Sequence, residues 1–151
     1  MAPSDVPDIS TLTIHEIATT EESDIAWVHN RLRSYNTVKP GGNDFRAVHL
    51  FLRDHKGVLQ GGLLGWTLWS WMHIDALWVE EALRGRGLGL RLLREAERIA
   101  VQRGCTQAET DTFDFQAPGF YEKAGYTVFG KLEGIGGRFT RYYVRKDLGR
   151  D

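Results

Sequence analysis

The segment Met72–Gly104 of this 151-residue chain reads MHIDALWVEEALRGRGLGLRLLREAERIAVQRG, and three structural signals follow one another in it. The first is a mostly apolar run, residues 72–79, which predicts a strand. Alternation would place Met72, Ile74, Ala76 and Trp78 on one face, and His73, Asp75, Leu77 and Val79 on the other. Because both faces carry apolar side chains, we expect a strand buried on both sides, inside a sheet covered by helices.

The second signal is a basic, glycine-rich turn, Arg84-Gly85-Arg86-Gly87-Leu88-Gly89. Glycine opens backbone conformations that other residues avoid, and it lets a ligand come close to the chain. A helix that begins in this turn would point its free N–H groups and its positive dipole end back into it. The turn is therefore suited to bind a diphosphate, and the guanidinium groups of Arg84 and Arg86 can pair with phosphate oxygens.

The third signal is an amphipathic helix. Apolar residues recur at helical spacing at Leu88, Leu92, Leu93, Ala96, Ile99 and Ala100. Gly104 is a suitable residue to end the helix, and a second strand, Cys105–Asp111, follows at once. A strand–helix–strand unit of this length implies a parallel pair of strands with a right-handed crossover.

The rest of the chain predicts more elements of both kinds. Residues 1–11 are expected to form a flexible tail, and residues 12–151 one domain. Within the domain we expect an edge strand at 12–18, a helix capped by Thr19, Thr20 or Ser23, a hairpin of strands 46–53 and 58–69, a short helix from Pro118 to Gly125, and strands at 126–133 and 138–146. The predicted fold is α/β: a mixed sheet of six or seven strands, with antiparallel outer parts, one central parallel pair, and helices on both faces.

Composition excludes several classes of function. The net charge is −1, which argues against a general nucleic-acid-binding or anionic-membrane surface. The single cysteine, Cys105, excludes an internal disulfide, and no metal cluster is expected. We find neither a signal peptide nor an apolar run that could span a bilayer, so we expect a cytoplasmic protein.

Two motifs, in order along the chain, point to one family. The first is Arg84-x-x-Gly87-x-Gly89, which Leu77-Trp78-Val79 precedes and a helix follows. The second runs from Asp114 through Ala117 to Phe120-Tyr121-Glu-Lys123-Ala-Gly125. Together they resemble the acetyl-CoA-binding signatures of the GNAT acetyltransferases, in particular the small single-domain bacterial members. The turn lacks the Lys-Ser/Thr pair of a nucleotide P-loop, which disfavours a phosphotransferase.

The resemblance implies acetyl-CoA as cosubstrate and assigns residues to it. The backbone N–H groups of residues 84–89, including Gly85 and Leu88, would hold the pyrophosphate, and Leu77, Trp78 and Val79 would lie beside the pantetheine arm. Phe120, Tyr121 and Lys123 belong to the second motif. Asp114 stands where the family usually has asparagine. It keeps an acceptor for the pantetheine amide but loses the donor, and capping of a helix is its alternative role.

Catalysis by direct transfer needs an acid for the departing sulfur and a neutral amine. The resemblance implies that Tyr121 is the acid, and a phenol pKa of about 10 is close to that of an alkyl thiol; the alternative is a core aromatic. Candidate bases are Glu80, then Asp75, then His73, each with the alternative of a solvated or paired group. We interpret Cys105 as a small core residue, so no acyl-enzyme is expected.

The sequence leaves the acceptor and the partners open. Four tryptophans, Trp66, Trp69, Trp71 and Trp78, could line a groove for an aromatic or cationic acceptor, or pack in the core and at a dimer contact. The expected acceptor is an amine of a small molecule or a peptide, and a homodimer is an open alternative to a monomer. The rival functions are a non-catalytic acyl-CoA-binding module and a structural interaction domain.

Overall fold

The structure is a computed structural model that describes residues 7–16, 22–38, 42 and 44–149. The chain divides into two units, Met1–Gly42 and Asn43–Asp151, which we describe separately.

The N-terminal unit holds two helical elements. A 3₁₀ turn, η1, spans Ile9–Thr11, and the Asp8 carboxylate caps it by accepting a 2.9 Å hydrogen bond from the Ser10 N–H. Helix α1 spans Glu22–Thr37, which confirms the predicted helix. Ser23 therefore lies inside α1 and is not its cap, while Thr19 and Thr20 lie outside the described residues. The strand predicted at 12–18 is not formed by residues 12–16, and residues 17 and 18 are outside the described part.

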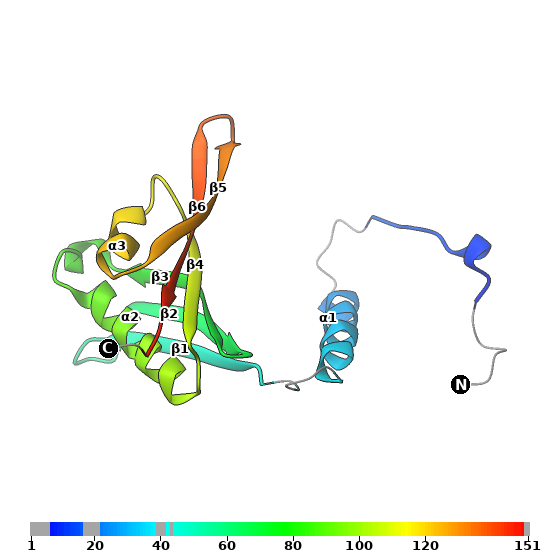
Figure 1. The fold of residues 1–151 in the computed structure, drawn as a ribbon, viewed down its shortest axis with the longest axis horizontal. Coiled ribbons are helices and arrows are strands. Elements are labelled where there is room, and N and C mark those ends of the chain that lie inside the picture. The colour runs from blue at the N-terminus through cyan, green and yellow to red at the C-terminus, as the bar shows by residue number, and fades with distance from the viewer. Residues whose placement is uncertain (1–6, 17–21, 39–41, 43, 150–151) are drawn as a thin grey trace. The chain divides into compact units, whose positions relative to one another are not determined.

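The second unit is built on a six-stranded sheet (Figure 1). Its strands are β1 (Arg46–Arg53), β2 (Leu59–Leu68), β3 (Trp71–Val79), β4 (Gln107–Phe113), β5 (Thr127–Ile135) and β6 (Phe139–Asp147). Their order is β1-β2-β3-β4-β6-β5, and β3 and β4 pair in parallel while the other recorded pairs are antiparallel. The prediction of a mixed α/β sheet with a central parallel pair is thus confirmed.

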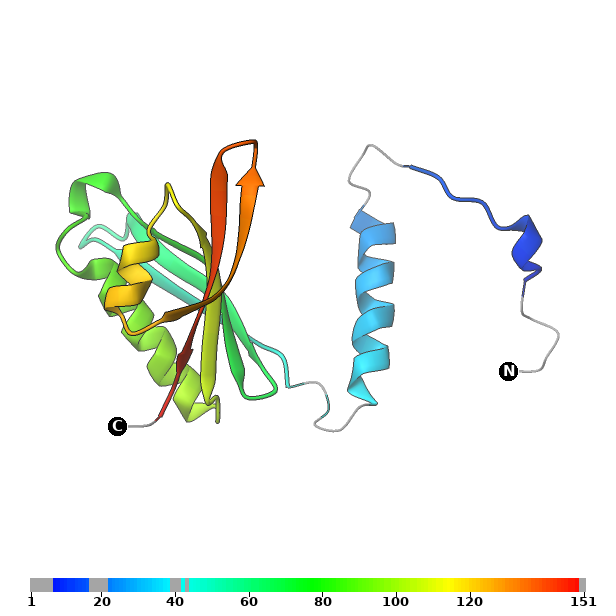
Figure 2. The same cartoon turned by 45° about the horizontal axis from the view of Figure 1, so that its top comes forward.

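Two helices of this unit pack on the same face of the sheet (Figures 1 and 2). Helix α2 spans Leu88–Gln102, and α3 spans Pro118–Lys123 with its proline in the first turn, where a missing N–H costs nothing. Leu93, Ala96 and Ala100 of α2 are fully buried in the core. That helices cover the second face of the sheet as well stays a prediction.

A buried carboxylate also holds α2 to the sheet. Glu97, 7% exposed, lies on the inner side of α2. It accepts hydrogen bonds from Lys146 Nζ at 3.0 Å and from the Tyr126 hydroxyl at 3.1 Å. Since a buried carboxylate is costly unless it is paired, these contacts tie α2 to Lys146 of β6 and to Tyr126.

One feature of β3 contradicts the predicted alternation of its faces. Leu64 of β2 pairs with Ala76, but the next residue, Gly65, pairs with Ile74, so β3 carries a bulge at Asp75. Beyond the bulge the alternation shifts: Val79 is buried together with Ile74, while Trp78 is 57% exposed. The prediction that Ala76 and Trp78 share the face of Met72 and Ile74 is therefore wrong, because a bulge adds one residue to the strand.

Candidate active site

The parallel pairing of β3 and β4 stops halfway along both strands. The last recorded pair is Ile74 with Thr110, and here the Thr110 hydroxyl donates a 2.8 Å hydrogen bond to the Ile74 carbonyl oxygen. Beyond it, β3 continues against β2 and β4 continues against β6, with no recorded pairing between them in residues 75–79 and 111–113. We call this place the β3–β4 fork. The first residue after the fork is an aspartate on each strand, Asp75 on β3 and Asp111 on β4.

The glycine-rich turn leads from β3 into α2. Gly85 and Gly87 have φ angles of 74° and 77°, in the left-handed region that glycine tolerates. Gly87 is the N-cap of α2, and no side chain caps the helix there. A Cβ built on either glycine meets nothing within 4 Å. The first N–H groups of α2 are thus not used by a side chain, and the space before them is open, which fits a bound diphosphate.

The arginines near this turn are held in different ways. Arg84 donates a 3.0 Å hydrogen bond from Nε to the Val79 carbonyl oxygen, and its guanidinium lies 4.3 Å from the ring centre of Trp78. Arg84 is therefore anchored to the end of β3 through Nε. In the described part of the chain no hydrogen bond is recorded for its two terminal nitrogens, so they can bind a phosphate. No partner is recorded for Arg86 or Arg91 within the described residues, so both can turn to an anion.

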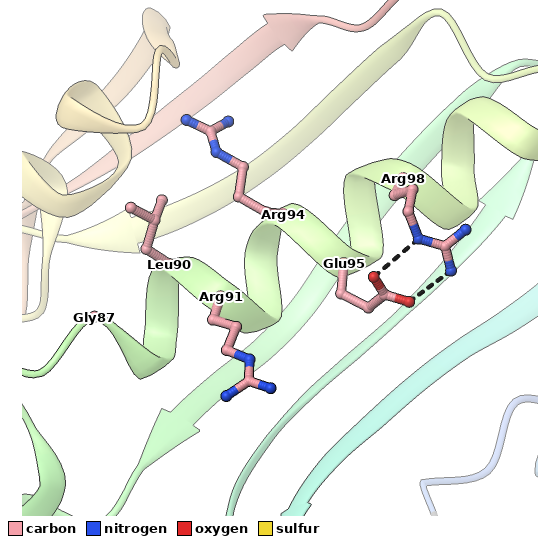
Figure 3. Close-up of a pocket in the computed structure, with 6 residues that line it drawn as sticks. All are labelled: Gly87, Leu90, Arg91, Arg94, Glu95 and Arg98. Atoms are coloured by element: carbon pink, nitrogen blue, oxygen red, sulfur yellow. Dashed lines mark hydrogen bonds and ion pairs between the residues drawn. The ribbon is translucent and has the colours of Figure 1, made fainter.

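A surface depression of about 640 Å³ follows the turn along α2 (Figure 3). It is lined by Gly87, Leu90, Arg91, Arg94, Glu95 and Arg98. Figure 3 shows Glu95 turned toward Arg98, with hydrogen bonds of 2.9 and 2.6 Å. Arg94 binds Glu97 at 2.8 Å, so Arg91 is the arginine here whose charge has no recorded acidic partner in the described chain. The sequence motif did not single out Arg91.

Tyr121 lies on the helix-covered face of the sheet, next to the fork. Its ring packs edge-on against those of Phe120 and Tyr126, with ring centres 5.1 and 5.6 Å away, and the Thr110 side chain lies close to its hydroxyl. Burial raises the pKa of Tyr121 above its ordinary value. The phenol therefore keeps its proton at neutral pH. Phe120 also lies beside Gly89, where a Cβ would come within 3.5 Å of its ring.

Two other residues of the second motif lie elsewhere. Asp114 Oδ2 accepts a 2.9 Å hydrogen bond from the Thr140 N–H, which ties the end of β4 to the start of β6. Asp114 does not cap α3, whose N-cap is Ala117. Lys123 is exposed at the last turn of α3.

The opposite face of β3 and β4 carries a polar pair that the sequence analysis did not find. His73 Nδ1 lies 2.5 Å from Glu109 Oε1, and the two residues are register partners one position before the fork. The Trp66 ring stacks on His73 with centres 4.9 Å apart. The hydrogen bond to Glu109 is the main cause that raises the pKa of His73. Glu109 could have been noticed in the alternation of Gln107, Glu109 and Asp111, but only the register brings it to His73.

The predicted bases lie at different distances from the fork. Asp75 is exposed at the bulge, with no hydrogen bond or ion pair recorded for its side chain in the described residues. Asp111 is paired with Arg141 at 2.7 Å. Glu80 follows the end of β3, five residues beyond Asp75, which is roughly 16 Å along a strand. Cys105 is buried, and burial raises the pKa of its thiol, which disfavours a nucleophilic thiolate.

Three of the four tryptophans have a recorded contact with a histidine or an arginine, and a groove lined by all four stays a prediction. Trp66 stacks on His73, Trp71 lies under Arg145 at 5.4 Å, and Trp78 lies against Arg84. Within the described residues no group of three or more His, Cys, Asp and Glu could hold a metal ion. No helix in that part of the chain has the length and apolar character needed to cross a membrane.

Comparison with known proteins agrees with this geometry. The family model described as "Acetyltransferase (GNAT) family" matches residues 13–126. Blasticidin-S acetyltransferase of Streptomyces morookaense is 42% identical over 94 residues, which are 62% of this chain and 69% of that protein. Acetyltransferase Atu2258 of Agrobacterium fabrum is 36% identical over 105 residues, 70% of this chain and 77% of that protein.

Comparison of the fold with solved structures also points to acetyltransferases. A crystal structure from Agrobacterium tumefaciens matches with a TM-score of 0.81 and 31% identity, covering 91% of this chain and 98% of that one. The relatives are acetyltransferases, which does not support the alternative of a non-catalytic acyl-CoA-binding module. The chain belongs to the GNAT family and is an N-acetyltransferase.

Proposed function

We propose that the acetyl group is transferred at the β3–β4 fork, directly to the amine of a small cationic molecule. The observation that carries this proposal is the arrangement around the last pair, Ile74 and Thr110. Tyr121 reaches Thr110 from the face of α2 and α3, while Asp75 follows Ile74 with its carboxylate exposed at the bulge. The Tyr121 hydroxyl, which can donate a proton, and the Asp75 carboxylate, which is anionic, thus both belong to residues next to the fork.

In this proposal the turn and the fork bind the two ends of acetyl-CoA. The N–H groups at the start of α2 and the side chains of Arg86 and Arg91 would hold the phosphates. The edge of β3 from Leu77 to Val79, which has no β4 partner, would lie along the pantetheine arm and offer it backbone hydrogen bonds. Acetyl-CoA supplies the acetyl group as a thioester.

Tyr121 is proposed to give its hydroxyl proton to the sulfur as the thiol leaves. Its raised pKa keeps the phenol protonated until then, and transfer to a thiolate is nearly balanced. Phe120 and Tyr126 exclude water from the ring of Tyr121, since both pack against it.

Asp75 is proposed to hold the incoming ammonium group. The neighbouring acids are already engaged, Glu109 by His73 and Asp111 by Arg141. Asp75 is therefore the acid at the fork whose charge can go to a substrate. Glu80, the first of the predicted bases, is too far along the strand for this contact, and we rank Asp75 above it.

The first acceptor to test is blasticidin S, because a relative with 42% identity is named for its acetylation. We expect thiol release from acetyl-CoA with blasticidin S or with other small cationic amines, and much slower release with lysine peptides or neutral aromatic amines. Release with lysine peptides alone would contradict the proposed small-molecule acceptor. A homodimer stays a prediction, which sedimentation of the purified chain can test.

A further inference from the structure

The His73 ring is held from two neighbouring strands. From β4, Glu109 binds its Nδ1 at 2.5 Å. From β2, the Trp66 ring stacks on it at an interplanar angle of 29°, and Phe45 packs on Trp66 with ring centres 5.8 Å apart. The side chains of His73 and Glu109 are only 21% and 26% exposed. The hydrogen bond to Glu109 and the stacking on Trp66 fix the orientation of the His73 imidazole. The ring of an exposed surface histidine is free to rotate.

The hydrogen bond also decides which nitrogen of His73 can accept a proton. In the neutral ring one nitrogen carries hydrogen and the other accepts. Glu109 accepts a hydrogen bond from Nδ1–H, which leaves Nε2 as the acceptor nitrogen. No hydrogen bond to Nε2 is recorded in the described residues. His73 precedes Asp75 by two residues, roughly 7 Å along the strand.

The charges around His73 are mostly negative. Asp75 on its own strand and Glu109 and Asp111 on β4 all favour the protonated ring, while partial burial opposes it. The basic groups on β6 are turned to other partners: Arg141 binds Asp111, and Arg145 binds Gln107 at 3.0 Å and lies 3.8 Å from Asp147. Among these contacts, no arginine or lysine is placed where its positive charge would oppose protonation of His73.

We propose that Glu109 is a positioning residue that holds His73 as the proton acceptor for the acceptor amine. The inference rests on the proposed function. It assigns to His73 the removal of a proton from the ammonium group that Asp75 binds. The ammonium group gives one proton to Nε2 of His73 and becomes a neutral amine. The nitrogen then bonds to the acetyl carbon, the carbon–sulfur bond breaks, and the sulfur takes the proton of Tyr121. The nitrogen then gives one of its two remaining protons to the Tyr121 phenolate and keeps the other as the amide N–H, and His73 returns its proton to solvent.

The first arm of the test is spectroscopic and needs no acceptor. Nitrogen-15 NMR of the wild-type protein should show a neutral His73 ring with hydrogen on Nδ1, and a titration midpoint above the ordinary value of about 6.5. Glu109→Gln should move that midpoint to lower pH. A neutral ring with hydrogen on Nε2, or an unchanged midpoint in Glu109→Gln, overturns the proposal even if the enzyme is active. If Glu109→Gln does not fold, the wild-type tautomer decides the question.

The second arm is kinetic. Glu109→Gln should lower kcat by about 10- to 100-fold and shift the pH–rate midpoint to lower pH, with acetyl-CoA affinity within about threefold of wild type. Glu109→Asp should recover part of the rate. The matched control is Glu133→Gln on β5, which removes an equal charge from an exposed pair with Lys131. An unchanged pH profile in Glu109→Gln would mean that Glu109 has only a structural role. Absence of thiol release in the wild type with every amine would instead contradict the proposed function.

Discussion

The hydroxyl of Thr110 donates a 2.8 Å hydrogen bond to the carbonyl oxygen of Ile74 at the point where β3 and β4 part. Both residues are buried, at 2% and 1% exposure. The recorded pairing of β3 with β4 ends at Ile74, so β4 offers no further paired N–H beyond this residue. The hydroxyl of Thr110 supplies a donor to the Ile74 carbonyl oxygen instead. The Thr110 side chain also lies close to the Tyr121 hydroxyl, so Thr110 stands between the fork and the proposed acid.

Replacing Thr110 should therefore weaken both the fold and the site. Thr110→Val keeps the side-chain shape but leaves the Ile74 carbonyl without its donor, which costs about 1–3 kcal/mol of unfolding free energy. Urea unfolding measures this loss. Thr110→Ser keeps the hydroxyl and should recover most of the stability. A valine variant as stable as wild type would show that the hydrogen bond does not hold the fork.

Removing the hydroxyl of Tyr121 should slow turnover without loss of binding. Tyr121→Phe is expected to lower kcat by roughly 10²-fold, because the leaving thiolate loses its proton donor. The KM for acetyl-CoA should stay within about threefold, since the ring still fills its place between Phe120 and Tyr126. Steady-state thiol release measures both constants. Wild-type kcat in this variant would remove Tyr121 from the mechanism.

A carboxylate at the start of α2 should prevent cofactor binding. Gly87→Glu puts bulk and negative charge where the diphosphate is proposed to bind, and calorimetry should detect no acetyl-CoA binding. The matched control is Gly104→Glu beyond the other end of α2, where φ is 84° and a Cβ also meets nothing within 4 Å. Both variants carry similar backbone strain, of about 1–2 kcal/mol. Equal affinity in the two would contradict the proposed phosphate site.

The stability contributed by His73 should depend on pH in a defined direction. The pKa of His73 is raised in the folded chain, mainly by Glu109. The folded state therefore binds the proton more tightly than the unfolded chain does, and the stabilisation is fully present below the unfolded pKa of about 6.5. It is lost as pH rises through the higher folded pKa. Wild type should thus exceed His73→Gln in unfolding free energy by more at about pH 6 than at about pH 9. A difference that grows toward alkaline pH would contradict the raised pKa.

The local parts of the fold could be predicted from the sequence. The helical spacing of leucine and alanine predicts a helix at the position of α2. Pro118 is the first residue of α3, and Gly125 follows its end. Gly85 and Gly87 of the turn adopt positive φ angles, which glycine tolerates, while Gly89 lies inside α2. Each of these features depends on residues that are close together in the chain.

The parts that could not be predicted depend on register between distant strands. The bulge at Asp75 arises from the pairing of β3 with β2, and it moves Ala76 and Trp78 to the other face. The contacts of Glu109 with His73 and of Asp114 with Thr140 join residues 36 and 26 positions apart. A one-residue shift of register would abolish them, and nothing in either segment alone indicates the register.

The most direct test of the account is a crystal structure with bound coenzyme A. We expect the diphosphate to accept hydrogen bonds from the N–H groups at the start of α2, and the pantetheine arm to lie between Leu77–Val79 of β3 and the end of β4, with the sulfur near the Tyr121 hydroxyl. Coenzyme A bound elsewhere, with the turn empty and β3 and β4 closed beyond Ile74 and Thr110, would contradict it.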